Sequence, residues 1–148
     1  GWEDHRRGFT HYAMGRILQS TDPDGARAQF LQADSFFARS GSSKLHRAYV
    51  ASQLAAFALT EDRPDEALNL TGVSIDLAAR HENAALLYTL VMLRAEALDL
   101  SGRASAGSEV RMDSLGWARY GFGSDWSVRA KLREIGALNP LNTARGRL

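Results

Sequence analysis

The sequence predicts an all-α protein built from three helix hairpins of about 40 residues each. Apolar residues recur at intervals of three and four from Phe9 to Leu138, and no segment shows the period of two that marks a strand. Polar turns containing Asp, Gly or Pro interrupt this pattern at regular intervals. Small residues that follow these turns are spaced 41 and 40 residues apart, which indicates a repeated structural unit.

The first hairpin begins with a helix expected from about Gly8 to Ser20. Asp22 and Pro23 predict the start of the second helix, because Asp is a favoured N-cap and proline is tolerated at the first helical position. Gly41 stands where a helix end often needs a left-handed residue. This hairpin should therefore end just before Gly41.

The second hairpin repeats this pattern. Ser43 is expected to cap a helix that reaches Leu59, and Asp62 and Pro64 stand in capping positions before a helix that ends near Arg80. A third hairpin, a capping helix and a frayed tail should follow, the whole folded part forming a single domain of residues 1–138. The three hairpins, the capping helix and the tail are expected at residues 8–40, 43–80, 83–120, 124–138 and 139–148.

Small residues mark equivalent points of the repeat. Ala26, Ala67 and Gly107 fall in register after the three turns, and Ala55 and Ala95 each lie twelve positions before the second and third of these. Small side chains let two packed helices approach closely. The pattern resembles the tetratricopeptide-repeat (TPR) family, in a variant of about 40 residues rather than the commoner shorter form.

The resemblance covers residues 8–123 and weakens in the third repeat, where Arg111 and Ser114 replace apolar or small residues. It implies a right-handed, TPR-like α-solenoid whose last helix closes the stack with a polar outer face. It also implies a concave groove, lined by the first helix of each hairpin, that holds a peptide or a partner helix. The residues expected to line this groove are Tyr12, Arg16, Gln19, Tyr49, Ser52, Gln53, Tyr88, Met92, Glu96 and Asp99.

A second candidate surface lies near the C-terminus, where aromatic residues gather within ten positions beside a basic one. Trp, Tyr and Arg are enriched at the centres of protein interfaces, although these rings would equally serve to pack the capping helix onto the helix before it. From Arg103 onward, eight basic residues stand against four acidic ones. The members of this candidate patch are Trp117, Arg119, Tyr120, Phe122 and Trp126.

Composition argues against several function classes. A net charge of +1 predicts no general attraction to nucleic acid or anionic lipid. The absence of cysteine excludes disulfides, thiolate zinc sites and cysteine nucleophiles. No stretch approaches the roughly 20 apolar residues of a membrane span. The histidines show no metal-ligand spacing, so no metal, cofactor or catalytic residue is expected; they are His5, His11, His46 and His81.

The expected function is that of a non-catalytic scaffold or adaptor that binds a protein or peptide. One alternative is an effector-binding sensor module, since such repeats resemble the sensor arms of large bacterial ATP-dependent transcription activators. Another is a helical hydrolase that uses His11 with nearby carboxylates. A first helix without an N-terminal cap repeat could also pair with a second copy. The chain is expected to be soluble, either in the periplasm with its signal peptide removed or in the cytoplasm. Its start at Gly1 fits a processed mature form or an excised fragment.

Overall fold

The computed structural model describes residues 1–81 and 83–112, and every regular element in this part of the chain is an α-helix. A further helix begins at residue 104 and continues to the end of the described part. The all-α prediction is confirmed for these residues, whereas the predicted capping helix and tail lie outside them. The five helices with both ends described are α1 (Trp2–Leu18), α2 (Pro23–Ser40), α3 (Lys44–Thr60), α4 (Pro64–Arg80) and α5 (Ala84–Leu100).

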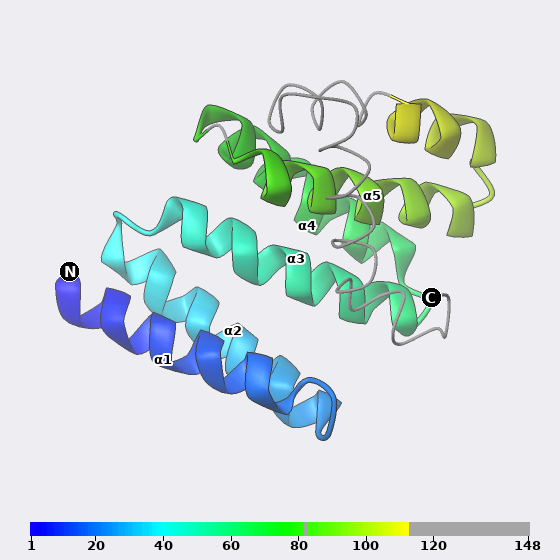
Figure 1. Ribbon diagram of the computed structural model, residues 1–148. Coiled ribbons are helices and arrows are strands. Elements are labelled where there is room, and N and C mark those ends of the chain that lie inside the picture. The colour runs from blue at the N-terminus through cyan, green and yellow to red at the C-terminus, as the bar shows by residue number, and fades with distance from the viewer. Residues whose placement is uncertain (82, 113–148) are drawn as a thin grey trace, which may run out of the picture.

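Each helix packs on its neighbour in the chain: α1 on α2, α2 on α3, α3 on α4 and α4 on α5, and α3 also contacts α5. Figure 1 shows α1, α3 and α5 following one another across the molecule. The apolar core is accordingly divided into three clusters of buried side chains, each shared by consecutive helices. The cluster that joins α2 to α3 consists of Ala26, Phe30, Ala33, Phe37 and Val50.

Local sequence signals set several helix ends as predicted. The carboxylate of Asp22 accepts a hydrogen bond from the backbone N–H of Gly25 at 3.0 Å, and Pro23 occupies the first position of α2. Gly41 follows α2 with a φ of 72°, the left-handed conformation that a helix end favours. The predicted bounds of α4 also match the structure.

The expectation that the first helix begins at Gly8 was wrong, because α1 already begins at Trp2. Glu3 and Asp4 stand in the first turn, where negative charge complements the helix dipole. Glu3 also accepts a hydrogen bond from Arg7 four residues later, at 2.6 Å. Gly8 lies buried in the helix interior, so it is a packing residue rather than the start of the helix.

The turn between α3 and α4 also differs from the expectation. Arg63 rather than Asp62 is the N-cap residue of α4, and Asp62 ends α3 with a φ of 58°. Its N–H bonds to the carbonyl of Leu59, and the N–H of Arg63 bonds to that of Ala58. This pair of bonds is the Schellman motif, in which the residue at the position of Asp62 adopts the left-handed conformation. Gly102 has the same place after α5, with a φ of 77°.

The small residues that suggested a repeat are all buried: Ala26, Ala55, Ala67, Ala95 and Gly107. The three that follow turns also share one backbone position, the fourth residue of a helix. Each donates its N–H to the carbonyl four residues earlier: Ala26 to Asp22, Ala67 to Arg63 and Gly107 to Arg103.

Candidate binding site

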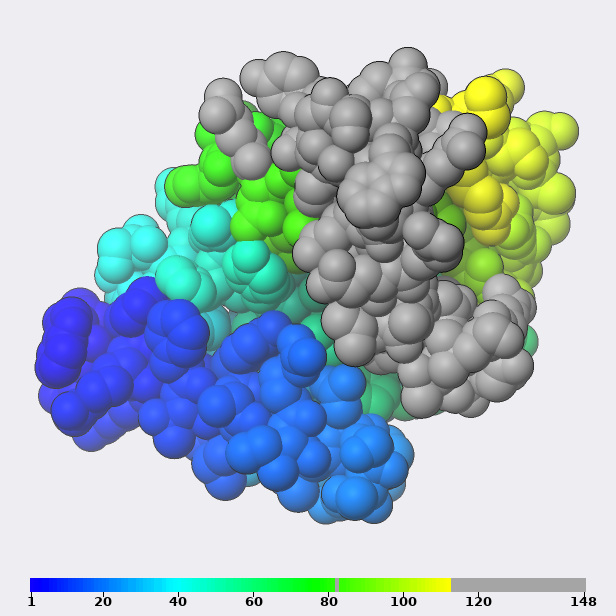
Figure 2. Space-filling view, viewed as in Figure 1, coloured from blue at the N-terminus to red at the C-terminus, as the bar shows by residue number. Residues whose placement is uncertain are grey.

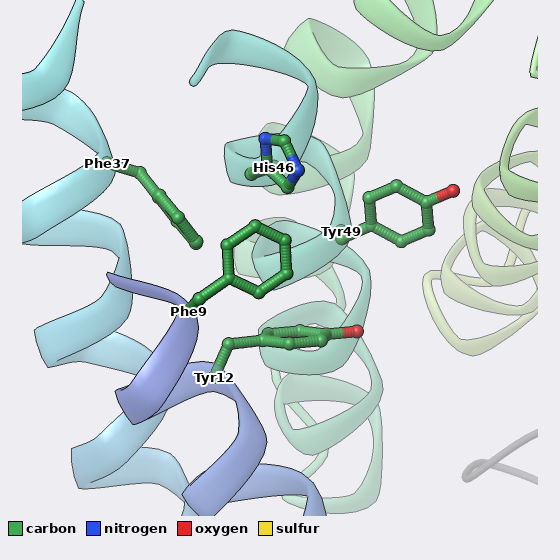
Figure 3. A pocket seen from close by; sticks show the side chains of 5 residues that line it. All are labelled: Phe9, Tyr12, Phe37, His46 and Tyr49. Atoms are coloured by element: carbon green, nitrogen blue, oxygen red, sulfur yellow. The ribbon is translucent and has the colours of Figure 1, made fainter. Parts of the chain in front are cut away.

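A pocket of about 210 Å³ lies between α1 and α3 (Figure 3). Phe9 and Tyr12 from α1 face His46 and Tyr49 from α3, and Phe37 from α2 completes the lining. Both helical pairs are spaced three residues apart, which places each pair on one face of its helix. We call this site the aromatic pocket. Figure 2 shows the blue surface of α1 beside the cyan surface of the α2–α3 turn and the first part of α3.

The walls of the aromatic pocket are rings that pack on each other. The centroid of Phe9 lies 4.8 Å from that of His46 and 5.8 Å from that of Phe37, with both ring pairs edge to face. Phe37 and His46 are 5.3 Å apart. Such edge-to-face contacts are favoured by the ring quadrupoles, so these rings stabilise one another in the wall of the pocket.

Two hydroxyl groups of the lining already have hydrogen-bond partners. The Tyr12 hydroxyl accepts a bond from Arg16 at 3.5 Å, and the Tyr49 hydroxyl accepts one from the amide of Asn83 at 2.6 Å. The same Asn83 caps α5, since its Oδ1 accepts from the backbone N–H of Leu86. Tyr49 therefore joins the pocket to the start of α5.

His46 is a lining residue whose ring nitrogens make no hydrogen bond to the described part of the chain. Its Nδ1 atom is buried without a partner, and no hydrogen bond joins its imidazole to the described part of the chain. The ring of His5 lies nearly perpendicular to it, with the centroids 4.9 Å apart. Burial, and secondly the charge of His5, lower the pKa of His46 below its ordinary value. Its imidazole is therefore neutral at neutral pH.

His5 makes a hydrogen bond between its Nδ1 and the Oγ of Ser43 at 2.5 Å, and Ser40 lies 2.6 Å from the same oxygen. Ser43 has the N-cap position of α3, as expected, but its hydroxyl makes no capping bond. Because Ser43 is fully buried, this hydroxyl cannot reach a substrate. The pair instead joins the start of α1 to the α2–α3 turn.

His11, the histidine of the hydrolase alternative, lies outside the aromatic pocket. Its Nδ1 is 2.6 Å from the amide oxygen of Gln29, and its ring stacks on Phe36 with a centroid distance of 5.3 Å. The guanidinium of Arg39 covers the Phe36 ring as well. The hydrogen-bond partner of His11 is thus an amide rather than a carboxylate.

The structure distributes the predicted groove residues over several environments. It brings Tyr12 and Tyr49 together in the aromatic pocket and leaves Arg16 exposed. Gln19, Met92 and Asp99 are half-buried. The Ser52 hydroxyl donates to the backbone carbonyl of Tyr49 in its own helix. Ser52 and the other three residues are buried; these are Gln53, Tyr88 and Glu96.

Asp99 and Glu96 are held by one basic side chain. Arg111, the residue at which the repeat pattern weakens, forms a hydrogen-bonded ion pair with Asp99 and lies 3.6 Å from Glu96. The bond to Asp99 is the main cause that raises the pKa of Arg111. These acids therefore pack the helix that begins at residue 104 onto α5. The predicted patch of Trp117, Arg119, Tyr120, Phe122 and Trp126 lies outside the described residues.

Phe9, Phe37 and His46 were not predicted as site residues from the sequence. One signal could have found the histidine: His5 and His46 are 41 residues apart, the same interval that separates Ala26 from Ala67. Two residues one repeat apart occupy equivalent positions in successive units, and such units pack side by side.

A second hollow, of about 440 Å³, lies where α2, α3 and α4 meet. Ala48 and Ala51 of α3 and Val73 of α4 contribute apolar surface to it. At its edge Arg47 makes a two-pronged ion pair with Asp34, with nitrogen–oxygen distances of 2.8 and 3.1 Å. We call it the α4 hollow.

No protein-family model, curated protein or solved structure matches the chain. Among residues 1–81 and 83–112, no three His, Asp or Glu side chains are grouped so that they could hold a metal ion. No helix in the same part of the chain combines the length and the apolar character needed to cross a membrane.

Proposed function

We propose that this protein is a non-catalytic interaction scaffold that binds a peptide or partner segment by accepting one large apolar side chain in the aromatic pocket. The pocket joins residues of two successive first helices, which is where a groove-binding partner would lie. Its volume of about 210 Å³ is below the roughly 300–1,000 Å³ typical of sites for drug-sized ligands. The pocket therefore suits the side chain of a peptide better than a whole effector.

The proposal includes a TPR-like, right-handed solenoid as the scaffold. Support comes from burial at repeat intervals, since Gly15, Ala55 and Ala95 lie 40 residues apart on α1, α3 and α5 and are all buried. Phe30 and Thr71, 41 residues apart on α2 and α4, are fully buried as well. Equivalent positions thus do the same packing in successive units, as repeat architectures require.

The test is a selection of displayed random peptides on the immobilised 148-residue chain, followed by affinity measurements on two variants of α1. Phe9 lines the aromatic pocket, whereas Ile17 is 75 % exposed on the same helix and does not. Phe9→Ala should weaken the selected peptides at least tenfold, and Ile17→Ala should leave their affinity unchanged. A selection without binders, or binders that tolerate Phe9→Ala, would overturn the proposal.

One observation favours the alternative of an effector-binding sensor. The α4 hollow, at about 440 Å³, lies within the size range of small-ligand sites. If the protein is a sensor of this kind, a small molecule should raise its melting temperature, and Ala51→Leu, which places a larger side chain in the hollow, should abolish that stabilisation.

A further inference from the structure

We propose that the side chain accepted by the aromatic pocket is an aromatic ring that carries a hydrogen-bond donor, the indole of Trp or the phenol of Tyr, and that it donates to the imidazole of His46. This inference rests on the proposed function, because it identifies the chemical class of the peptide's anchoring residue. It distinguishes Trp and Tyr from Phe, Leu and Met.

His46 has hydrogen-bonding capacity that the described part of the chain leaves unused. Nearly all buried polar groups in proteins have a partner, and one that lacks a partner calls for an explanation. The Nδ1 atom of His46 is buried without one, in a ring that forms part of the pocket wall. Because Nδ1 is buried, a ligand in the pocket would bond to the other nitrogen of the ring, which also makes no hydrogen bond to the described part of the chain.

The other lining residues are less suited to accept a hydrogen bond from a ligand. Phe9 and Phe37 have no polar atoms to offer, and the hydroxyls of Tyr12 and Tyr49 already accept bonds from neighbouring side chains. His46 is therefore the side chain in the lining that has yet to make a hydrogen bond. The pocket combines ring-shaped apolar walls with one polar wall, which matches a ring with a single polar edge.

The protonation state of His46 bears on the direction of the bond. The groups that titrate around the ring are His5 beside it and the two tyrosines of the lining. Burial and the proximity of His5 favour the neutral form of His46. A neutral imidazole has one nitrogen that accepts a hydrogen bond and one N–H that donates, and the proposed ligand is one that donates to the accepting nitrogen. Both the indole N–H and the phenol O–H meet this requirement.

The experiment compares two probes that differ in one donor. NMR titrations of the full chain with 3-methylindole and 1,3-dimethylindole present the same ring with and without its N–H group. We expect 3-methylindole to bind at least fivefold more tightly, with chemical-shift changes centred on the aromatic pocket. His46→Phe keeps a ring of similar shape and should remove this preference, whereas His11→Phe, the same substitution outside the pocket, should preserve it.

Each outcome separates the inference from the function on which it rests. Equal binding of both indoles would overturn the inference while leaving an aromatic-binding pocket, and a preference that survives in His46→Phe would place the acceptor elsewhere. If neither indole binds at the pocket, the inference fails, whereas the proposed function is decided by the peptide selection and the Phe9→Ala variant. The comparison of the two probes on the unmodified chain does not depend on whether the variants fold.

Discussion

Gly8 of α1 lies directly against the ring of Phe37 in α2, so that a Cβ atom on Gly8 would lie 2.6 Å from Cδ1 and Cε1 of that ring. Seven residues further along α1, Gly15 has the same relation to Phe30, which lies seven residues earlier on α2. The two contacts therefore fix the register of two antiparallel helices. They also position the aromatic pocket, because Phe37 is part of its lining.

Replacing Gly8 by Ala should destabilise the protein by about 1–3 kcal/mol, the usual cost of adding a methyl group to a well-packed core. The substitution should do so although Ala favours a helix by about 0.5–1 kcal/mol over Gly. Urea unfolding measures the change. Combining Gly8→Ala with Phe37→Ala should cost less than the sum of the single changes, because the two residues are in contact.

Gly72 in α4 provides the control for this prediction. A Cβ there would meet its nearest neighbour, a guanidinium nitrogen of Arg94, at an ordinary 3.5 Å. Gly72→Ala should therefore stabilise the protein by about 0.5–1 kcal/mol through helix propensity alone. If Gly8→Ala stabilises to the same extent, the close packing of α1 against Phe37 is contradicted.

Replacing Asp62 by Gly should stabilise the protein. The left-handed conformation costs an ordinary L-residue about 1–2 kcal/mol, and glycine avoids this cost while losing about 0.5–1 kcal/mol of backbone entropy. Asp62→Gly should thus stabilise by about 0.5 kcal/mol in thermal or urea unfolding. Gly102→Ala, at the equivalent position after α5, should destabilise the protein. If Asp62→Gly destabilised the protein and Gly102→Ala stabilised it, the assignment of two Schellman ends would be contradicted.

Removal of the cap on α2 should be costly. Asp22→Ala deletes the carboxylate that accepts from Gly25 and should lower the free energy of unfolding by about 1 kcal/mol. Asp22→Asn keeps an acceptor at this position and should lose much less, since Asn is as good an N-cap as Asp. Circular dichroism during urea unfolding distinguishes the two variants, and equal losses would show that the hydrogen bond does not carry the effect.

Much of the fold could be predicted because its signals are local. Asp22 with Pro23, Pro64 and Gly41 act on the backbone beside them, so their effect does not depend on contacts with distant parts of the chain. The start of α1 could not be located in this way. Gly8 signals a boundary in isolation, and only the Phe37 ring packed against it explains a glycine inside a helix.

The candidate site was predicted less well because it depends on how α1 and α3 are rotated about their axes. A modest rotation of α3 decides whether Tyr49 or Ser52 faces α1. The spacing of apolar residues in the sequence does not determine this rotation closely enough. Tyr12 and Tyr49 were placed on the correct helices, and the structure brings them into one pocket. The contact of His46 with Phe9 joins residues that are far apart in the sequence, so only the packed helices reveal it.

The stability of the protein should decrease as the pH falls below about 6.5. His46 has a lowered pKa in the folded state, because its ring is buried and lies beside His5, whereas the unfolded chain has the ordinary value of about 6.5. Between these two values the unfolded state binds more protons, so acid favours unfolding there. This contribution is therefore fully present above about pH 7.5 and is lost as the pH falls from 6.5 to the lowered pKa.

Urea unfolding between pH 5 and 8 should show the decline, and His46→Phe should make it shallower. His81→Phe removes an exposed histidine at the end of α4 and should leave the profile as it is. Parallel profiles for His46→Phe and the unmodified chain would mean that another group causes the decline.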